Sequence, residues 1–204
     1  MSRPLLFQAL EPVVGAFELL SVPYHLGGSV ASSAVGTART TLDVDLVADL
    51  RAGQVCPFVA ELKDLYYASE AAIRDAVSRR SCFNVIHLPT MFKVDVFVLK
   101  ERSYDRAAFS RRRLGRLSIG EHSAEFMLAS PEDIVLNKLE WFRLGDEVSE
   151  RQWLDVLGVL RVQRGRLDEK YLVEWANELN LKELLLRAER EAWGTDTQPP
   201  ARSP

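Results

Sequence analysis

Three aspartates interrupt apolar segments of the sequence in a pattern that suits the binding of divalent metal ions. Asp43 and Asp45 lie two residues apart in the segment DVDLVA, and Asp95 lies in FKVDVFVLK. Residues two apart in a β-strand face the same side, so the first two carboxylates can converge. A lone carboxylate in a buried strand is costly unless it is paired or binds a metal. If the two strands are neighbours, the three acids form one cluster that favours a cation such as Mg²⁺.

Each of these acids also has a simpler interpretation. An Asp-x-Asp at the end of a strand can cap a turn or face solvent, and Asp49, just before a loop, has the placement of such an acid. The combination of the three acids with a glycine turn upstream is what favours a metal site.

That turn consists of two glycines and a serine. Gly27 and Gly28 allow a tight turn and the close approach of a ligand, while Ser29 stands where the N-cap of a helix would stand. The start of a helix offers N–H groups to a phosphate, and the Ser29 hydroxyl can add a hydrogen bond. Alone, the motif is typical of a plain turn, and it lacks the lysine and the spacing of a P-loop.

The hydrophobic pattern predicts the elements that position these residues. In the first part of the chain it predicts helices over residues 4–20, 29–36, 54–63 and 69–80, strands over residues 24–26, 43–48, 65–68, 82–88 and 92–100, and a hairpin over residues 116–129. This alternation predicts an α+β fold, in which a small mixed β-sheet is flanked by helices.

From Ser130 onward the pattern is helical. Ser130 and Pro131 have the form of an N-cap and a first helical residue, and residues 131–145, 150–163, 168–179 and 182–193 are predicted to form a C-terminal helical bundle. We therefore expect a core domain over residues 1–129, a helical domain over residues 130–193 and a disordered tail over residues 194–204.

Composition sets wider limits on the protein. The chain has 204 residues and 47% hydrophobic content, enough for a substantial core. It shows neither a transmembrane segment nor a signal peptide, which favours a cytoplasmic location and no membrane partner. Cys56 and Cys82 have no close Cys or His partner, so we expect reduced, packed thiols. The net charge of −3 argues against a generic nucleic-acid binder, although the basic run Arg111–Arg116 is typical of either a solvated loop or a local phosphate-binding patch.

In combination, the turn and the acids resemble the signature of the DNA polymerase β-like nucleotidyltransferase superfamily. The matching residues are Leu26-Gly27-Gly28-Ser29, then Asp43-Val44-Asp45, then Asp95. Within this signature, GTARTTLDVDLV resembles small bacterial nucleotidyltransferases, including abortive-infection and toxin–antitoxin toxins, through Gly36, Arg39 and Thr41. The resemblance implies the nucleotidyltransferase fold, followed by the helical bundle.

The resemblance extends to two residues of the helical part. The toxin-like group carries a lysine on one helix and an aspartate on the next, both returning to the active site, and Lys138 and Asp155 occupy comparable places. Lys138 shares a helix face with Ile134 and Trp141, although a surface lysine with its stem along the helix also fits. Asp155 beside an apolar stripe fits a solvent-facing or arginine-paired acid equally well.

The resemblance also implies the site and its ligands. Asp43, Asp45 and Asp95 would bind Mg²⁺ or Mn²⁺, and Asp95 would help to deprotonate the attacking hydroxyl. The substrate would be a nucleoside triphosphate such as ATP, held by Gly27, Gly28, Ser29, Arg39, Thr41 and Lys138, with Asp155 as a further catalytic residue.

The implied reaction is transfer of a nucleoside monophosphate to a hydroxyl of RNA, such as a tRNA 3′ end, or of a protein. The protein would then be the toxin of a toxin–antitoxin or phage-defence system, with a cognate antitoxin and the Arg111–Arg116 loop gripping RNA phosphates. Two alternatives stay open. One is an inactive module of the same fold that binds a nucleotide or a partner, and the other is a two-metal phosphodiester hydrolase.

Overall fold

The computed structural model describes residues 3–37 and 43–194, which form two compact units. Residues 3–34 and 43–130 belong to a unit built on a β-sheet, and residues 35–37 and 131–194 belong to a helical unit. Arg39, Thr41 and the predicted tail after Gly194 lie outside the described residues.

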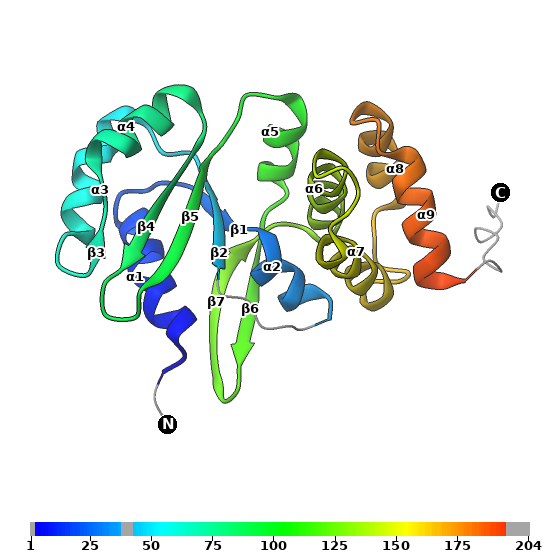
Figure 1. The fold of residues 1–204 in the computed structure, drawn as a ribbon, viewed down its shortest axis with the longest axis horizontal. Helices are drawn as coiled ribbons and strands as arrows, with labels where there is room; N and C mark the ends of the chain where they lie inside the picture. Colours follow the sequence, from blue (N-terminus) through cyan, green and yellow to red (C-terminus); the bar gives the residue numbers. More distant parts are fainter. Residues whose placement is uncertain (1–2, 38–42, 195–204) are drawn as a thin grey trace. The chain divides into compact units, whose positions relative to one another are not determined.

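Within the described residues, seven strands form one mixed sheet in the order β3-β4-β5-β2-β1-β7-β6 (Figure 1). Their bounds are β1 Tyr24–Leu26, β2 Asp43–Ala48, β3 Tyr66–Tyr67, β4 Cys82–His87, β5 Phe92–Val98, β6 Arg113–Ile119 and β7 His122–Leu128. Strand β2 pairs in parallel with β5 and antiparallel with β1. The predicted α+β fold with a mixed sheet is therefore confirmed.

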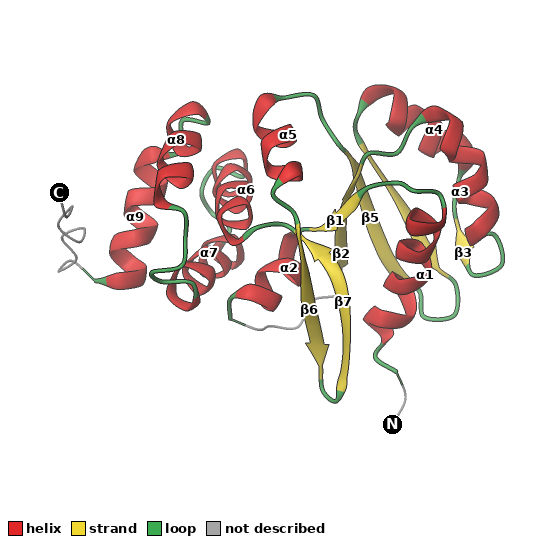
Figure 2. Ribbon diagram, turned by 180° about the vertical axis from the view of Figure 1, so that it is seen from behind, coloured by secondary structure: helices red, strands yellow, loops and turns green. Residues whose placement is uncertain are grey.

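One face of the sheet is covered by helices α1 (Leu5–Leu19) and α3 (Val55–Leu62), with α4 (Glu70–Arg79) beside α3 (Figure 2). Phe17 of α1 stacks on Phe58 of α3 at 4.9 Å between ring centroids, and Phe58 meets Phe83 of β4 at 6.2 Å. Burying these rings removes a large apolar area from water and anchors the sheet. Every second residue of β2 and β5 points into this core, so the intervening residues face the opposite side.

Helix α2 (Gly28–Val35) follows β1, and helix α5 (Ser103–Ser110) precedes β6. Helix α5 was not expected, because its segment SYDRAAFS is only eight residues long and lies between charged residues. The expected loop over Arg111–Arg116 is wrong, since Arg111 ends α5 and Arg113 begins β6. Residues Arg113–Arg116 pair with β7 and therefore belong to the sheet.

The helical unit contains α6 (Pro131–Leu144), α7 (Glu150–Val162), α8 (Glu169–Glu178) and α9 (Lys182–Trp193), as the sequence predicted. The side chain of Ser149 caps α7, and that of Asp168 caps α8. The indole of Trp153 in α7 contacts Phe142 of α6 and donates a hydrogen bond to Glu191 of α9, which ties three helices together. None of the described helices is long and apolar enough to cross a membrane.

Candidate active site

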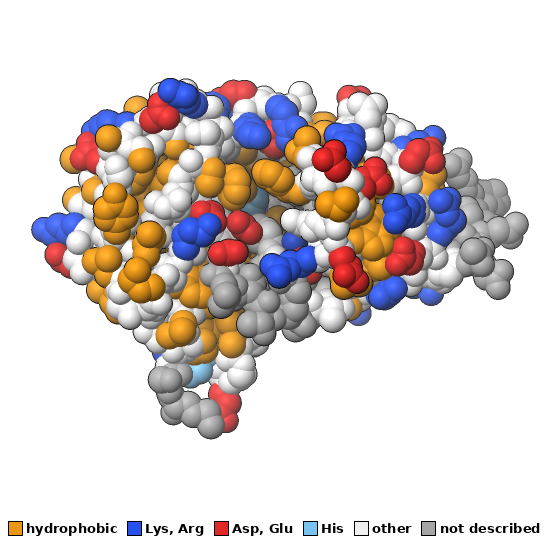
Figure 3. Space-filling view, viewed as in Figure 1, with side chains coloured by type: hydrophobic (Ala, Val, Ile, Leu, Met, Phe, Trp, Pro, Cys, Tyr) orange, Lys and Arg blue, Asp and Glu red, His pale blue; other side chains and the backbone are white. Residues whose placement is uncertain are grey.

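The parallel pairing of β2 with β5 brings the three predicted acids together. Asp45 lies directly opposite Asp95, and Asp43 lies opposite Lys93. Residues opposite each other on paired strands have neighbouring side chains, so the three carboxylates form one row on the sheet. Acidic side chains gather over β2 and β5 in the space-filling view (Figure 3).

This row faces away from the apolar core. Val44 and Leu46 are fully buried on the other face, whereas Asp43 is exposed and Asp45 is partly exposed. The side chain of Asp95 is 16% exposed. Water or a ligand can therefore reach the acids, which lowers the cost of keeping them charged.

The glycine turn contacts this row directly. The Gly27 N–H donates to the carbonyl of Asp45 at 2.9 Å, and the Gly27 carbonyl accepts from Ala31 at 3.1 Å. Helix α2 begins at Gly28, so the expected N-cap at Ser29 is wrong: two glycines let the strand turn straight into the helix, and Ser29 lies in its first turn.

Only glycine suits position 28. Its φ is +54°, and a Cβ there would lie 1.7 Å from Oδ2 of Asp45. The Asp45 carboxylate thus packs against the N-terminus of α2, where the helix dipole favours negative charge.

Lys93 is a cation beside this row that was not among the predicted site residues. Its Nζ forms an ion pair of 2.7 Å with Oδ2 of Asp95. The hydrogen bond to Asp95 raises the pKa of Lys93, and the charges of Asp95, Asp43 and Asp45 raise it further, against a smaller lowering by burial. The signal was present in the sequence, because Lys93 lies two residues before Asp95 on the same strand face.

Cys82 also borders the row, on β4 opposite Phe97. The residue is exposed as a whole, but partial burial of its thiol raises the thiol pKa to about 11, and the carboxylates of Asp95 and Asp45 add to the effect. Cys56 and Cys82 are both free thiols, but both are exposed, so the prediction that they are packed is wrong. Apolar packing had been inferred from residue type alone.

The acids have the oxygen donors that Mg²⁺ prefers, and the register makes them neighbours. Their side chains do not yet surround a common point: among residues 3–37 and 43–194, no group of three or more His, Cys, Asp or Glu is arranged to hold a metal ion. The Lys93 ammonium already engages Asp95. The backbone fits a metal site, and a metal would have to displace this ammonium.

A buried histidine lies next to the row on β1. His25 is opposite Val47, it is 4% exposed, and its Nδ1 has no hydrogen-bond partner. Burial lowers its pKa to about 3, and the charge of Arg112 adds to this lowering. The ring packs against Phe109 of α5 at 5.3 Å between centroids. The imidazole is therefore neutral at physiological pH and serves packing.

Lys138 and Asp155 meet within the helical unit. Nζ of Lys138 on α6 donates to Oδ2 of Asp155 on α7 at 2.6 Å and to Oε1 of Gln152 at 3.1 Å. Both side chains are buried, with exposed fractions of 5% and 4%. The alternatives of a surface lysine and a solvent-facing or arginine-paired acid are therefore wrong, and the two residues form one buried ion pair.

The sequence matches no known family profile and no curated protein. The structure, however, is similar to the solution structure of the antibiotic-resistance factor ANT(2'')-Ia, with a TM-score of 0.53 and 13% identity over 90% of this chain and 96% of that chain. A crystal structure of ANT(2'')-Ia with adenylyl-2''-tobramycin gives a TM-score of 0.52 and 14% identity over 88% of this chain and 99% of that one. The crystal structure of the lincosamide antibiotic adenylyltransferase LnuA with bound lincomycin gives a TM-score of 0.46 and 13% identity, over 76% of this chain and 96% of that chain. The chain has the nucleotidyltransferase fold.

Proposed function

We propose that this protein is a nucleotidyltransferase that transfers a nucleoside monophosphate from a nucleoside triphosphate to a hydroxyl group. The observation that carries the proposal is the pairing of Asp45 with Asp95, beside a Gly27-Gly28 turn that touches the same carboxylate. A phosphate site at a helix start and a carboxylate row for divalent ions are the two parts that such a transfer requires.

In the proposed reaction, the acceptor oxygen attacks the α-phosphorus, and the bond from that phosphorus to the pyrophosphate oxygen breaks. Asp43, Asp45 and Asp95 would hold Mg²⁺ or Mn²⁺, which supplies positive charge to the triphosphate. Asp95 would also accept the proton of the attacking hydroxyl. The backbone of Gly28 and the Ser29 hydroxyl would bind the outgoing phosphates.

Lys138 and Arg39 are proposed to neutralise phosphate charge, with Thr41 as a further phosphate contact. Asp155 would orient the Lys138 ammonium, to which it is hydrogen-bonded. A lysine hydrogen-bonded to a buried carboxylate keeps its position, which suits a binding group better than a mobile surface lysine does.

The acceptor belongs to one of two classes. The resemblance to bacterial toxins supports RNA, such as a tRNA 3′ end, or a protein, and with it an antitoxin partner. The structural similarity to ANT(2'')-Ia, which was solved with adenylyl-2''-tobramycin, supports a small-molecule hydroxyl. Incubation with each of the four α-labelled nucleoside triphosphates and bulk tRNA, total cell protein or an aminoglycoside distinguishes them by which product carries the label.

The Asp43→Asn/Asp45→Asn double variant tests the proposal itself. We expect it to lose metal-dependent triphosphate binding and pyrophosphate release, because two oxygen ligands become weak neutral ones. Unchanged transfer by this variant would refute the proposal. Nucleotide binding that needs no metal, equal in the wild type and Asp95→Ala, would favour an inactive binding module, and release of a nucleotide without pyrophosphate would favour a hydrolase.

A further inference from the structure

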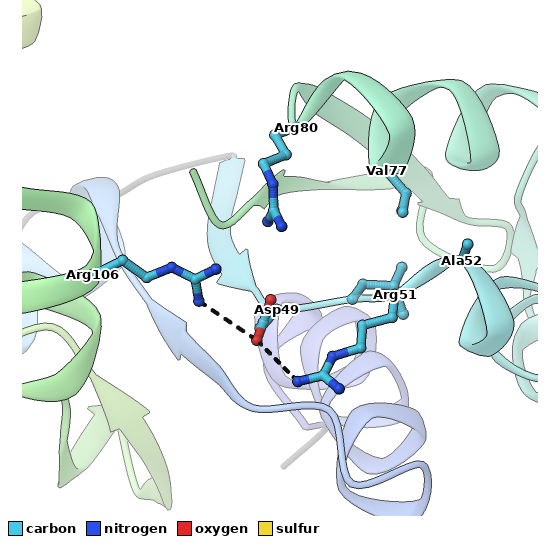
Figure 4. Close-up of a pocket in the computed structure, with 7 residues that line it drawn as sticks. Asp49, Arg51, Ala52, Val77, Arg80 and Arg106 are labelled. Carbon is cyan, nitrogen blue, oxygen red and sulfur yellow. Dashed lines mark ion pairs between the residues drawn. The ribbon is translucent and has the colours of Figure 1, made fainter. Parts of the chain in front are cut away.

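A pocket lies at the opposite end of β2 from the carboxylate row. It has a volume of about 360 Å³ and is lined by Asp49, Leu50, Arg51, Ala52, Val77, Arg80 and Arg106 (Figure 4). Strand residues advance by about 3.3 Å each, so Asp49 lies roughly 13 Å along the chain from Asp45. The pocket is therefore separate from the proposed active site, and its lining is dominated by arginine.

One carboxylate fixes two of these arginines. Glu101 forms an ion pair with Arg80, and its Oε2 accepts from Nε and Nη2 of Arg106 at 3.2 and 2.8 Å. Nη1 of Arg80 also donates to the carbonyl of Leu99 at 2.6 Å. Two guanidinium groups are thus held beside each other before any ligand binds, which removes part of the entropic cost of binding.

The charges in the pocket do not cancel. Asp49 lies 3.8 Å from Arg51 and 3.8 Å from Arg106, which is an ion-pair distance but too long for a hydrogen bond. Figure 4 shows the guanidinium groups of Arg51 and Arg106 on either side of the Asp49 carboxylate. Three guanidinium groups face two carboxylates, Asp49 and Glu101, so one positive charge remains.

Arg80 lines the pocket from the end of helix α4. It ends α4 with φ of +48° and ψ of +47°, a left-handed conformation that glycine adopts most easily. A left-handed residue of this kind commonly ends a helix. Here the side chain reaches Glu101 and the pocket.

We propose that this pocket binds a phosphate group. Arginine forks match phosphate oxygens in shape and charge, and the site offers N–H groups that Asp49 leaves unsatisfied. The phosphate can belong to a free polyphosphate or to the backbone of a nucleic acid. The site does not depend on the transferase reaction proposed above.

Binding in the absence of divalent metal tests the pocket, because the carboxylate row, with three acids and the single ammonium of Lys93, then repels phosphate. With EDTA at low salt, calorimetry would measure the affinity of the protein for inorganic pyrophosphate. Fluorescence anisotropy would measure its affinity for a labelled single-stranded RNA. Arg106→Gln should weaken binding about five- to tenfold through loss of a charged donor. Asp49→Asn should tighten binding, because it removes a competing negative charge and leaves the contacts of Glu101 in place.

Arg164→Gln is the matched control, since it removes the same charge from an exposed side chain that does not line the pocket, and it should leave the affinity for both ligands unchanged. Opposite shifts in Arg106→Gln and Asp49→Asn for pyrophosphate would support a site for free polyphosphates. The same shifts for RNA alone would assign the site to a nucleic-acid backbone. Because misfolding cannot produce the gain expected of Asp49→Asn, absence of that gain with both ligands would overturn the proposal, as would binding of neither ligand.

Discussion

Replacing Gly28 with alanine should disable the carboxylate row while leaving the sheet folded. The φ of +54° costs an alanine about 1–2 kcal/mol. The new Cβ would lie 1.7 Å from Oδ2, 2.6 Å from Cγ and 2.9 Å from Cβ of Asp45, so that side chain must turn away and the backbone must shift slightly. Because Asp45 is partly exposed and can rotate, we expect this clash to add only about 1 kcal/mol, for a total near 2–3 kcal/mol.

The two effects separate in different assays. The midpoint of thermal unfolding should fall by roughly 4–12 °C, because each kcal/mol lowers it by about 2–4 °C in a chain of this size. Nucleotide transfer should fall by at least about 100-fold, because a displaced carboxylate no longer meets the metal. Gly27→Ala is the matched control: Gly27 has no positive φ, and its Cβ would lie 4.0 Å from the nearest atom, the carbonyl oxygen of Asp45. It should keep its stability.

A second background tests the assigned cause. In Asp45→Gly, no side-chain atom remains at position 45, so Gly28→Ala should cost about 1–2 kcal/mol from backbone strain alone. An equal loss of stability in both backgrounds would refute the clash with Asp45. Full activity of Gly28→Ala in the wild-type background would refute the role of the turn in positioning that carboxylate.

Three further substitutions probe charge. Lys93→Met should raise the affinity for Mn²⁺ severalfold in a titration followed by electron paramagnetic resonance, because no ammonium then competes for Asp95. The control is Lys100→Met, which replaces an exposed lysine beyond the end of β5 and should leave the affinity for Mn²⁺ unchanged. Lys138→Met should lower the free energy of unfolding in urea by about 3–5 kcal/mol, since it strands a buried carboxylate, whereas Lys138→Met/Asp155→Leu should lose less. Burial lowers the pKa of His25 to about 3 in the folded protein, against 6.5 in the unfolded chain. Between these pH values only the unfolded chain binds the proton, so the stability of the fold falls as the pH drops. From pH 7 to pH 4 this contributes about 3 kcal/mol, and His25→Gln should flatten the urea-measured profile by that amount.

Each of these has a result that contradicts it. An unchanged Mn²⁺ affinity in Lys93→Met would mean that the ammonium does not oppose metal binding. A double variant of Lys138 and Asp155 that is no more stable than Lys138→Met would mean that the buried charge is not the cause of the loss. An equal pH slope in His25→Gln would assign the acid sensitivity to other groups.

The strands of the site could be predicted because their sequences determine them locally. DVDLVA and FKVDVFV are rich in valine, and polar and apolar residues alternate over DVDL and FKVDV. The structure has the first strand over Asp43–Ala48 and the second over Phe92–Val98. Their pairing could only be inferred from the cost of a lone acid, since nothing in the local pattern specifies a neighbouring strand.

Other features depend on tertiary contacts and could not be predicted. Helix α5 is short, and its place is fixed by the packing of Phe109 on His25. The pairing of β6 with β7 overrides the loop-like composition of Arg113–Arg116. The partner of Lys138 lies on another helix, so a pattern along one helix could show that this lysine was unusual but not that Asp155 neutralises it.

The arrangement around Asp95 reconciles a row of acids with a stable fold in the absence of metal. Three neighbouring carboxylates repel one another, and the protein offsets this repulsion with the Lys93 ammonium and with the N-terminus of α2 beside Asp45. Because the Lys93 side chain is 44% exposed, its ammonium can return to water without breaking the core. The same contact that stabilises the metal-free protein therefore opposes metal binding. A divalent ion bound as proposed would displace it by carrying twice the charge, and its affinity would be lower by the strength of the contact that it breaks.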